Sequence, residues 1–230
     1  MTLETIITNI GTMLDDNVVP YLWTNEELTE YYNQSVEEWC RVTDANVDNT
    51  TITVCKITTT AGTQSYALHD SILRILNAYV YGETAFLEKQ STDYMLALYG
   101  TLGLTDRAKP LYYTLDQRMG YFSLWPVPVA NGFVYLTVSR LPITELSYVT
   151  PSLPATPGTG GEPDIPPRFH RDMFAGVLYR AYKKNDADTE SLARAQSFKV
   201  EWDKVLDRGI MDNSLYNYRP QAIVPGYGFI

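Results

Sequence analysis

The chain has few of the residues that build metal centres and nucleophilic active sites. Its 230 residues include only two histidines and two cysteines. His69 and His170 lie far apart in the sequence, and neither has the spacing to cysteine that a zinc site needs. There is no Gly-x-Ser-x-Gly motif, and the glycine-rich stretch 158–161 lacks the lysine of a phosphate-binding loop. We therefore expect no catalytic residues, no metal and no cofactor.

The chain also lacks a basic excess and long apolar runs. Its net charge of −9 argues against a general nucleic-acid-binding protein. No apolar run is long enough to cross a bilayer, and residues 1–16 lack the basic start of a signal peptide. Cys40 and Cys55 fall in a predicted helix and a predicted strand, and we expect reduced, partly buried thiols rather than a disulfide. These features predict a cytosolic protein with no membrane partner.

Aromatic residues are abundant, and charge is unevenly distributed. The 18 Tyr, 7 Phe and 4 Trp suit wet interfaces, because Tyr and Trp combine large contact area with a polar group. Residues 1–165 carry 8 basic and 19 acidic side chains, whereas residues 166–208 carry 9 basic and 7 acidic ones. A solvated helix face is the usual reason for such a basic bias, and contact with an acidic partner is the alternative.

Apolar residues recur at helical spacing near both ends of the chain. The pattern predicts helices over 3–14, from Thr24 to about Arg41, and as a pair within 164–208, with Asp188 as the N-cap of the last. Thr24 and Glu27 form a capping box. Residues 1–45 and 163–208 are therefore predicted to form one helical bundle. The large side chains expected in its core or in subunit packing are Trp23, Tyr31, Trp39, Phe169, Met173, Phe198 and Trp202.

The middle of the chain changes to a period of two. Alternating side chains predict strands over 50–60, 64–81, 110–115, 121–125 and 133–140. A hairpin turn is predicted at 117–120, and a short helix over 91–99 capped by Ser91 or Thr92. We therefore predict an α+β fold: a bundle of N-terminal and C-terminal helices with an inserted, mostly antiparallel β module over residues 46–150.

Two stretches belong to neither the predicted helical bundle nor the predicted β module. Residues 151–162 are rich in proline, glycine and threonine, which predicts a flexible loop. Residues 209–230, the C-terminal arm, have few charges and show neither the helical nor the strand periodicity. The arm therefore cannot bury its apolar side chains locally and needs a partner. The arm residues expected to contact that partner are Leu215, Tyr216, Tyr218, Pro220, Ile223, Val224, Tyr227, Phe229 and Ile230.

Two other functions are compatible with an aromatic β module. A glycan hydrolase would need converging carboxylates, for which Asp116 and Glu145 are the candidates. A carbohydrate-binding module would expose Trp125, Tyr112 or Tyr113 as a stacking platform, although sheet core is the simpler interpretation of these rings. Neither alternative accounts for the arm or the C-terminal helices.

Several short motifs, taken in order, resemble the head-to-tail connector (adaptor, or head-completion) proteins of tailed bacteriophages. The motifs cover about residues 20–208, and His69 stands where that family usually has proline. They are Trp23-Thr24-x-x-Glu27-Leu28, the strand at 65–75, Lys109-Pro110-Leu111-Tyr112-Tyr113, Leu124-Trp125-Pro126-Val127-Pro128, Leu141-Pro142, and Ile165-Pro166-Pro167 with the two helices that follow.

The resemblance implies a structural virion protein at the neck, between head and tail, assembled in the host cytoplasm. It implies a homo-oligomeric ring of twelve copies that contacts the portal protein above and a tail, nozzle or tube protein below. The C-terminal arm would reach the portal, and DNA would pass through the ring without sequence-specific binding. The loop at 151–162 and the β module are the candidates for tail-side contact. The alternative remains a carbohydrate-binding or glycan-hydrolysing tail component.

Overall fold

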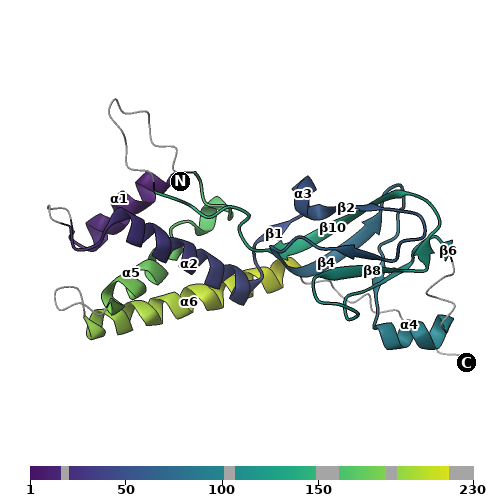
Figure 1. Cartoon of the computed structure of the whole chain (residues 1–230). Helices are drawn as coiled ribbons and strands as arrows, with labels where there is room; N and C mark the ends of the chain where they lie inside the picture. The colour runs from purple at the N-terminus through teal and green to yellow at the C-terminus, as the bar shows by residue number, and fades with distance from the viewer. Residues whose placement is uncertain (17–20, 101–106, 149–160, 185–190, 218–230) are drawn as a thin grey trace, which may run out of the picture.

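The structure, a computed structural model, consists of a helical lobe and a β lobe joined end to end (Figure 1). It describes residues 1–16, 21–100, 107–148, 161–184 and 191–217. The helical lobe contains α1 (Leu3–Met13), α2 (Asn25–Thr43), α5 (Met173–Lys183) and α6 (Leu192–Asn217). Its helices come from both ends of the chain, and the strands come from the middle. The predicted α+β fold is therefore confirmed.

The ends of α2 follow from local hydrogen bonding. Thr24 Oγ1 accepts the N–H of Glu27 at 3.1 Å, and Glu27 Oε2 accepts the N–H of Thr24 at 3.0 Å. This is the predicted capping box, and it satisfies two N–H groups at the helix start. The helix ends where Asp44 adopts a left-handed conformation with a φ of 52°.

A short 3-10 helix precedes the first C-terminal helix. Residues Pro167–Phe169 form the 3-10 helix η2, and α5 begins only at Met173. Proline at the first position of η2 is favourable, because its fixed φ suits a helix start and its missing N–H would be unpaired there anyway. The predicted N-cap Asp188 lies outside the described residues.

The second C-terminal helix ends later than predicted. α6 continues through Gly209 to Asn217, whereas the sequence predicted a helix end near Arg208 and an arm from residue 209. A Cβ at Gly209 would lie 2.6 Å from Thr43 Cγ2 and 2.9 Å from Trp39 Nε1. The glycine therefore allows α6 to pass close to α2, and this tertiary contact outweighs its low helix propensity.

The β lobe consists of two packed sheets and a small third pair. The first sheet contains β1 (Val47–Asp48), β2 (Lys56–Thr59), β4 (Ile72–Val80) and β10 (Gly132–Arg140). The second contains β3 (Ser65–Ala67), β5 (Glu88–Lys89), β7 (Tyr112–Thr114) and β8 (Tyr121–Trp125), and β6 (Arg107–Ala108) pairs with β9 (Val127–Pro128). In the first sheet β10 pairs antiparallel with β1, β2 and β4. The predicted hairpin is the antiparallel pair of β7 and β8.

The strand predicted over residues 50–60 is wrong in its first half. Residues Ile52–Cys55 form the short helix α3, so Cys55 lies in a helix rather than a strand. The carboxylate of Asp48 accepts the backbone N–H groups of Thr50 and Thr51, at 2.8 and 3.2 Å. These bonds turn the chain before α3, because an aspartate side chain can replace the backbone partner that a strand would supply.

Other local predictions in the β lobe are confirmed. The predicted short helix is α4 (Thr92–Tyr99), and Ser91 Oγ caps it by accepting the N–H of Tyr94 at 3.2 Å. Along β10 the side chains of Val134, Leu136 and Val138 are buried at alternate positions. They form the second hydrophobic cluster with residues of β7 and β8, while the helices enclose a separate first cluster.

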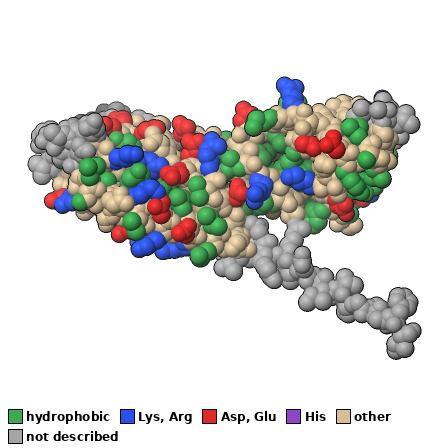
Figure 2. Space-filling model, turned by 90° about the horizontal axis from the view of Figure 1, so that it is seen from below, with side chains coloured by type: hydrophobic (Ala, Val, Ile, Leu, Met, Phe, Trp, Pro, Cys, Tyr) green, Lys and Arg blue, Asp and Glu red, His purple; other side chains and the backbone are tan. Residues whose placement is uncertain are grey.

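The surface differs between the two lobes. Figure 2 shows basic and acidic side chains interspersed over the helical lobe, and hydrophobic side chains gathered toward the far end of the β lobe. Mixed charge on the helices in this view agrees with a solvated face. Within the described ranges, no helix combines the length and apolar character needed to span a bilayer.

Candidate functional site

The large side chains predicted for the bundle lie in or against the first hydrophobic cluster. Those that are buried are Trp23, Trp39, Phe169, Met173 and Trp202, and those that are half-buried at its edge are Tyr31 and Phe198. The rings of Trp39 and Phe169 pack with centroids 4.6 Å apart. Because most of this set is covered within one subunit, Tyr31 and Phe198 have the most surface left for a neighbour. Their role in subunit packing stays a prediction.

A charged contact joins the N-terminal and C-terminal helices. Arg180 on α5 donates hydrogen bonds to the carboxylate of Glu38 and, at 3.0 Å, to Ser35 Oγ on α2. Trp202 Nε1 on α6 donates to the same Glu38 carboxylate at 3.2 Å. The three helices are therefore held in register by polar contacts as well as by apolar packing.

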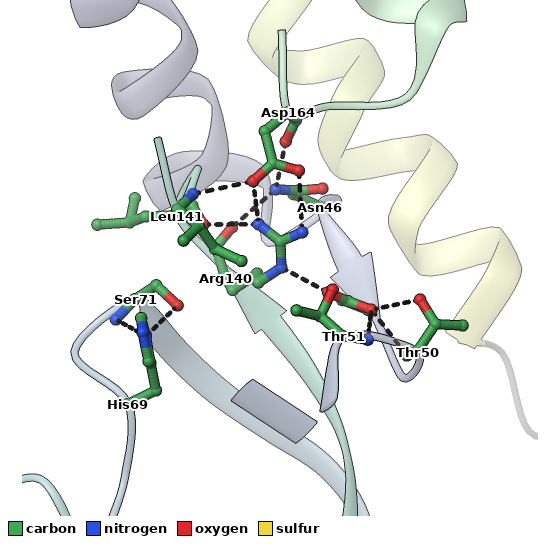
Figure 3. A network of polar contacts seen from close by, with 10 residues as sticks. Asn46, Thr50, Thr51, His69, Ser71, Arg140, Leu141 and Asp164 are labelled. Atoms are coloured by element: carbon green, nitrogen blue, oxygen red, sulfur yellow. Dashed lines mark hydrogen bonds and ion pairs between the residues drawn. The ribbon is translucent and has the colours of Figure 1, made fainter. Parts of the chain in front are cut away.

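A network around Arg140 occupies the junction between the lobes (Figure 3). Arg140 ends β10, and its Nε donates to Asp48 Oδ2 of β1 at 2.7 Å. Its Nη1 and Nη2 donate to the two carboxylate oxygens of Asp164, at 2.6 and 2.9 Å. Asn46 Nδ2 donates to the backbone oxygens of Arg140 and Asp164. The network thus ties the β lobe to the segment that leads back into the helical lobe.

Both charges of the central pair are favoured by their surroundings. Burial alone would raise the pKa of the Asp48 carboxyl, but hydrogen bonds from Thr51, Thr50 and Arg140 outweigh it and hold that pKa well below its usual range. Burial alone would lower the pKa of Arg140. The carboxylates of Asp164 and Asp48 outweigh this effect and raise the pKa above its ordinary value. The junction is therefore an ion-pair network in which the charged forms of Asp48 and Arg140 are both favoured.

The predicted docking arm lies largely outside the described residues. That holds for the whole of 218–230, and for the side chains of Leu215 and Tyr216, whose backbone belongs to α6. Just before this point, Asn213 Nδ2 donates to the backbone oxygen of Thr43 at 2.8 Å. This contact holds the C-terminal part of α6 beside the lobe junction. The predicted loop at 151–162 also lies outside the described residues, apart from its last two positions.

The residues considered for glycan chemistry do not form a site. Trp125 and Tyr113 are buried in the β lobe, and Tyr112 is half-buried, so Trp125 is no exposed platform. Asp116 accepts the N–H and hydroxyl of Thr92 at the start of α4, whereas Glu145 lines a groove beside α2 in the other lobe. The two candidate carboxylates therefore do not converge.

An exposed aromatic face was missed in the sequence. Along the outer side of the first sheet, Tyr79 stacks on Tyr135 with ring centroids 5.6 Å apart, and Tyr81 packs edge-on against Phe133 at 6.5 Å. Phe86 packs against Tyr79. We call these five residues the aromatic face. Its signal was present: aromatic residues at alternate positions of two paired strands must share one side of the sheet.

The two histidines have structural contacts. His69 Nδ1 lies 2.9 Å from Ser71 Oγ, and buried His170 Nε2 lies 3.0 Å from the backbone oxygen of Ile165. Burial lowers the pKa of His170, which favours the neutral ring. Among the side chains that the structure describes, no three His, Cys, Asp or Glu residues gather in a way that could hold a metal ion.

Comparison with known proteins gives one family match. The family model described as SU10 adaptor protein matches residues 1–223, which is nearly the whole chain. The search of curated proteins found no match.

Proposed function

Because this chain belongs to the SU10 adaptor protein family, we propose that it is a structural virion protein that forms a head-to-tail adaptor ring. The ring would join the portal to the tail. The family match over residues 1–223 carries the proposal, and it agrees with the resemblance to phage connectors found in the sequence motifs. The protein is thus a bacteriophage adaptor, and the ring, its portal contact and its DNA channel are the proposed details.

The subunit has features that suit such a ring. Two lobes joined end to end by the Arg140 network give it two regions for different neighbours (Figure 1). A ring of about twelve copies would bring the helical lobes side by side, and the net charge of −9 would let DNA pass without being held. The proposal assigns no catalytic role and places the protein at the neck of the virion, after assembly in the host cytoplasm.

The C-terminal arm is the proposed portal contact. It would bind in an ordered form and lose conformational entropy on docking, while a tail, nozzle or tube protein would bind the opposite side of the ring. A junction of roughly 2,000 Å² or more per contact is typical of permanent assemblies. The long helix α6 supports this role, because it continues to Asn217 and so fixes the point from which residues 218–230 extend.

The carbohydrate-binding alternative predicts different behaviour. It would need glycan-dependent quenching of tryptophan fluorescence, yet Trp125 is fully buried. The aromatic face contains Tyr and Phe but no Trp. We therefore favour the adaptor function, and the tail-component alternative would be revived only by measured binding or turnover of a polysaccharide.

Particle mass tests the proposal. Mass photometry and negative-stain imaging of the purified protein, alone and mixed with a portal ring, should show a ring or a portal-bound ring. Counting the added mass gives the number of copies. A monomer that stays a monomer in the presence of the portal would overturn the ring and the portal contact together.

A further inference from the structure

Two residues of the aromatic face are largely exposed to solvent. The side chain of Tyr81 is 67% exposed and that of Phe86 is 59% exposed. Lys56 on β2 places its Nζ 3.8 Å from the centre of the Phe133 ring, so the face carries one cation. Contiguous exposed rings of this kind mark an interaction surface rather than scattered surface residues.

Two grooves mark the two ends of this face. The groove nearer the helical lobe has a volume of about 460 Å³ and lies between the end of α6 and β4, with Ile210, Asn213 and Asn77 in its lining. The far groove has a volume of about 490 Å³ and is lined by Tyr81 and Phe133, among others. Asn77 stands two residues before Tyr79 on β4, so the first groove adjoins the aromatic face.

α6 therefore delivers its C-terminal continuation to the near end of the aromatic face. The continuation, residues 218–230, has thirteen residues, and the only charged side chain among them is Arg219. From Asn77 to Tyr81 the strand spans only about 13 Å, whereas thirteen extended residues reach up to about 45 Å. The segment is long enough to cross the face and place a ring in the far groove.

We propose that residues 218–230 cover the aromatic face of their own subunit before assembly. Pro220, Ile223 and Val224 would lie over the ring pairs, and Tyr227 or Phe229 would enter the far groove. Tethering to α6 favours this intramolecular contact, because a short linker gives an effective concentration in the millimolar range. The aromatic and apolar composition of both surfaces supplies the attraction.

Under the proposed function, this contact would keep the aromatic face covered until the subunit docks on the portal. The same arm cannot cover the face and bind the portal at once, so docking would uncover the aromatic face. The uncovered face then becomes available to the next partner in assembly, and a free subunit keeps it covered. The inference itself concerns only the isolated subunit, and it rests on the proposed function solely for the later destination of the arm.

Engineered disulfides test the contact in the full chain. The test variant combines Tyr81→Cys with Phe229→Cys, and a second version replaces Tyr81→Cys by Phe86→Cys. The matched control combines Met119→Cys with Phe229→Cys, because Met119 is 98% exposed in the turn between β7 and β8 of the other sheet. The native Cys40 and Cys55 are buried and stay in place. Oxidation at about 1 µM protein is followed by intact mass and disulfide mapping under denaturing conditions.

The proposal predicts an intrachain disulfide that forms about tenfold faster in both test variants than in the control. Equal rates in the test and control variants would show a free tether and would overturn it. Disulfide-linked dimers as the main product would place the arm on a second copy and would also overturn it. Failure of portal binding with a positive cross-link would leave this inference standing and remove only the portal contact.

Discussion

Arg140 donates its Nε–H to Asp48 Oδ2 at 2.7 Å, and both side chains are only 7% exposed. The pair spans 92 residues of sequence, from the first to the last strand of the main sheet. Asp164, at the start of the return to the helices, adds a second carboxylate to the same guanidinium. One buried cation thus holds three segments that meet between the lobes.

Replacing Arg140 with methionine should destabilise the protein strongly. The variant Arg140→Met leaves the Asp48 carboxylate buried without its cation, which typically costs about 3–5 kcal/mol of unfolding free energy. Urea denaturation followed by circular dichroism measures this loss. The control Arg41→Met removes an exposed pair with Glu37 on α2 and should cost no more than about 1 kcal/mol. Equal losses in the two variants would contradict a special role for the junction.

The Asp48 carboxyl should make stability depend on acid pH. Its pKa is lower in the folded state than its ordinary value of 3.8, so the ionised group stabilises the folded protein above that pH. As the pH falls below 3.8 the unfolded chain binds the proton first, and this stabilisation is progressively lost. Thermal unfolding of the native protein and Asp48→Asn should therefore converge between pH 4 and pH 2. A constant gap in that range would argue against the shift.

Two glycines should respond oppositely to alanine. In Gly209→Ala the new methyl group would lie 2.6 Å from Thr43 Cγ2, and overpacking of this kind costs about 1–3 kcal/mol. In Gly11→Ala on α1 the nearest atom is 3.9 Å away, so the higher helix propensity of alanine should stabilise by up to about 1 kcal/mol. Chemical denaturation compares the two. Stabilisation by both substitutions would show that α6 can move away from α2 without loss.

Neither cysteine should react while the protein is folded. Burial raises the pKa of the Cys40 thiol to about 12 and that of the Cys55 thiol to about 11, so little thiolate forms at neutral pH. A chromogenic thiol reagent at pH 8 should label fewer than about one in ten thiols within the time that fully labels the urea-unfolded protein. Rapid labelling of the native protein would mean that one of the two sites opens readily.

Removing the arm should separate folding from docking. Deletion of residues 218–230 leaves α6 intact to Asn217, so the far-ultraviolet circular dichroism should be unchanged. Binding to the portal ring should be lost in the same sample, as measured by mass photometry. A deletion of 151–161 serves as the matched control and should retain portal binding. Full portal affinity without the arm would disprove its docking role.

Local hydrogen-bond chemistry made much of the fold predictable. The capping box at Thr24 and the alternation along β10 depend on neighbouring residues, so the sequence shows them directly. The continuation of α6 through Gly209 could not be predicted, because it depends on a contact with Thr43 some 166 residues earlier. α3 was missed because the carboxylate of Asp48 turns a chain whose alternation is typical of a strand.

The candidate site was less predictable than the fold. Trp125, Tyr113 and Tyr81 are all aromatic residues of the β lobe. Trp125 and Tyr113 are nevertheless buried, whereas Tyr81 is largely exposed. Which side of a sheet faces solvent depends on how the two sheets pack, and a single strand does not record it. The bundle residues were easier to find, because a helix stripe with Trp39 must be covered by something.

The helical lobe is built from both ends of the chain, so its helices are synthesised at different times. α1 and α2 are complete at Thr43, but their main partners, α5 and α6, are finished only at Asn217. At the usual speed of translation the wait is on the order of ten seconds, and the β-strands emerge within it. Nascent chains must therefore carry a half-built bundle with Trp39 uncovered, and during this interval newly made subunits are open to chaperones and to aggregation.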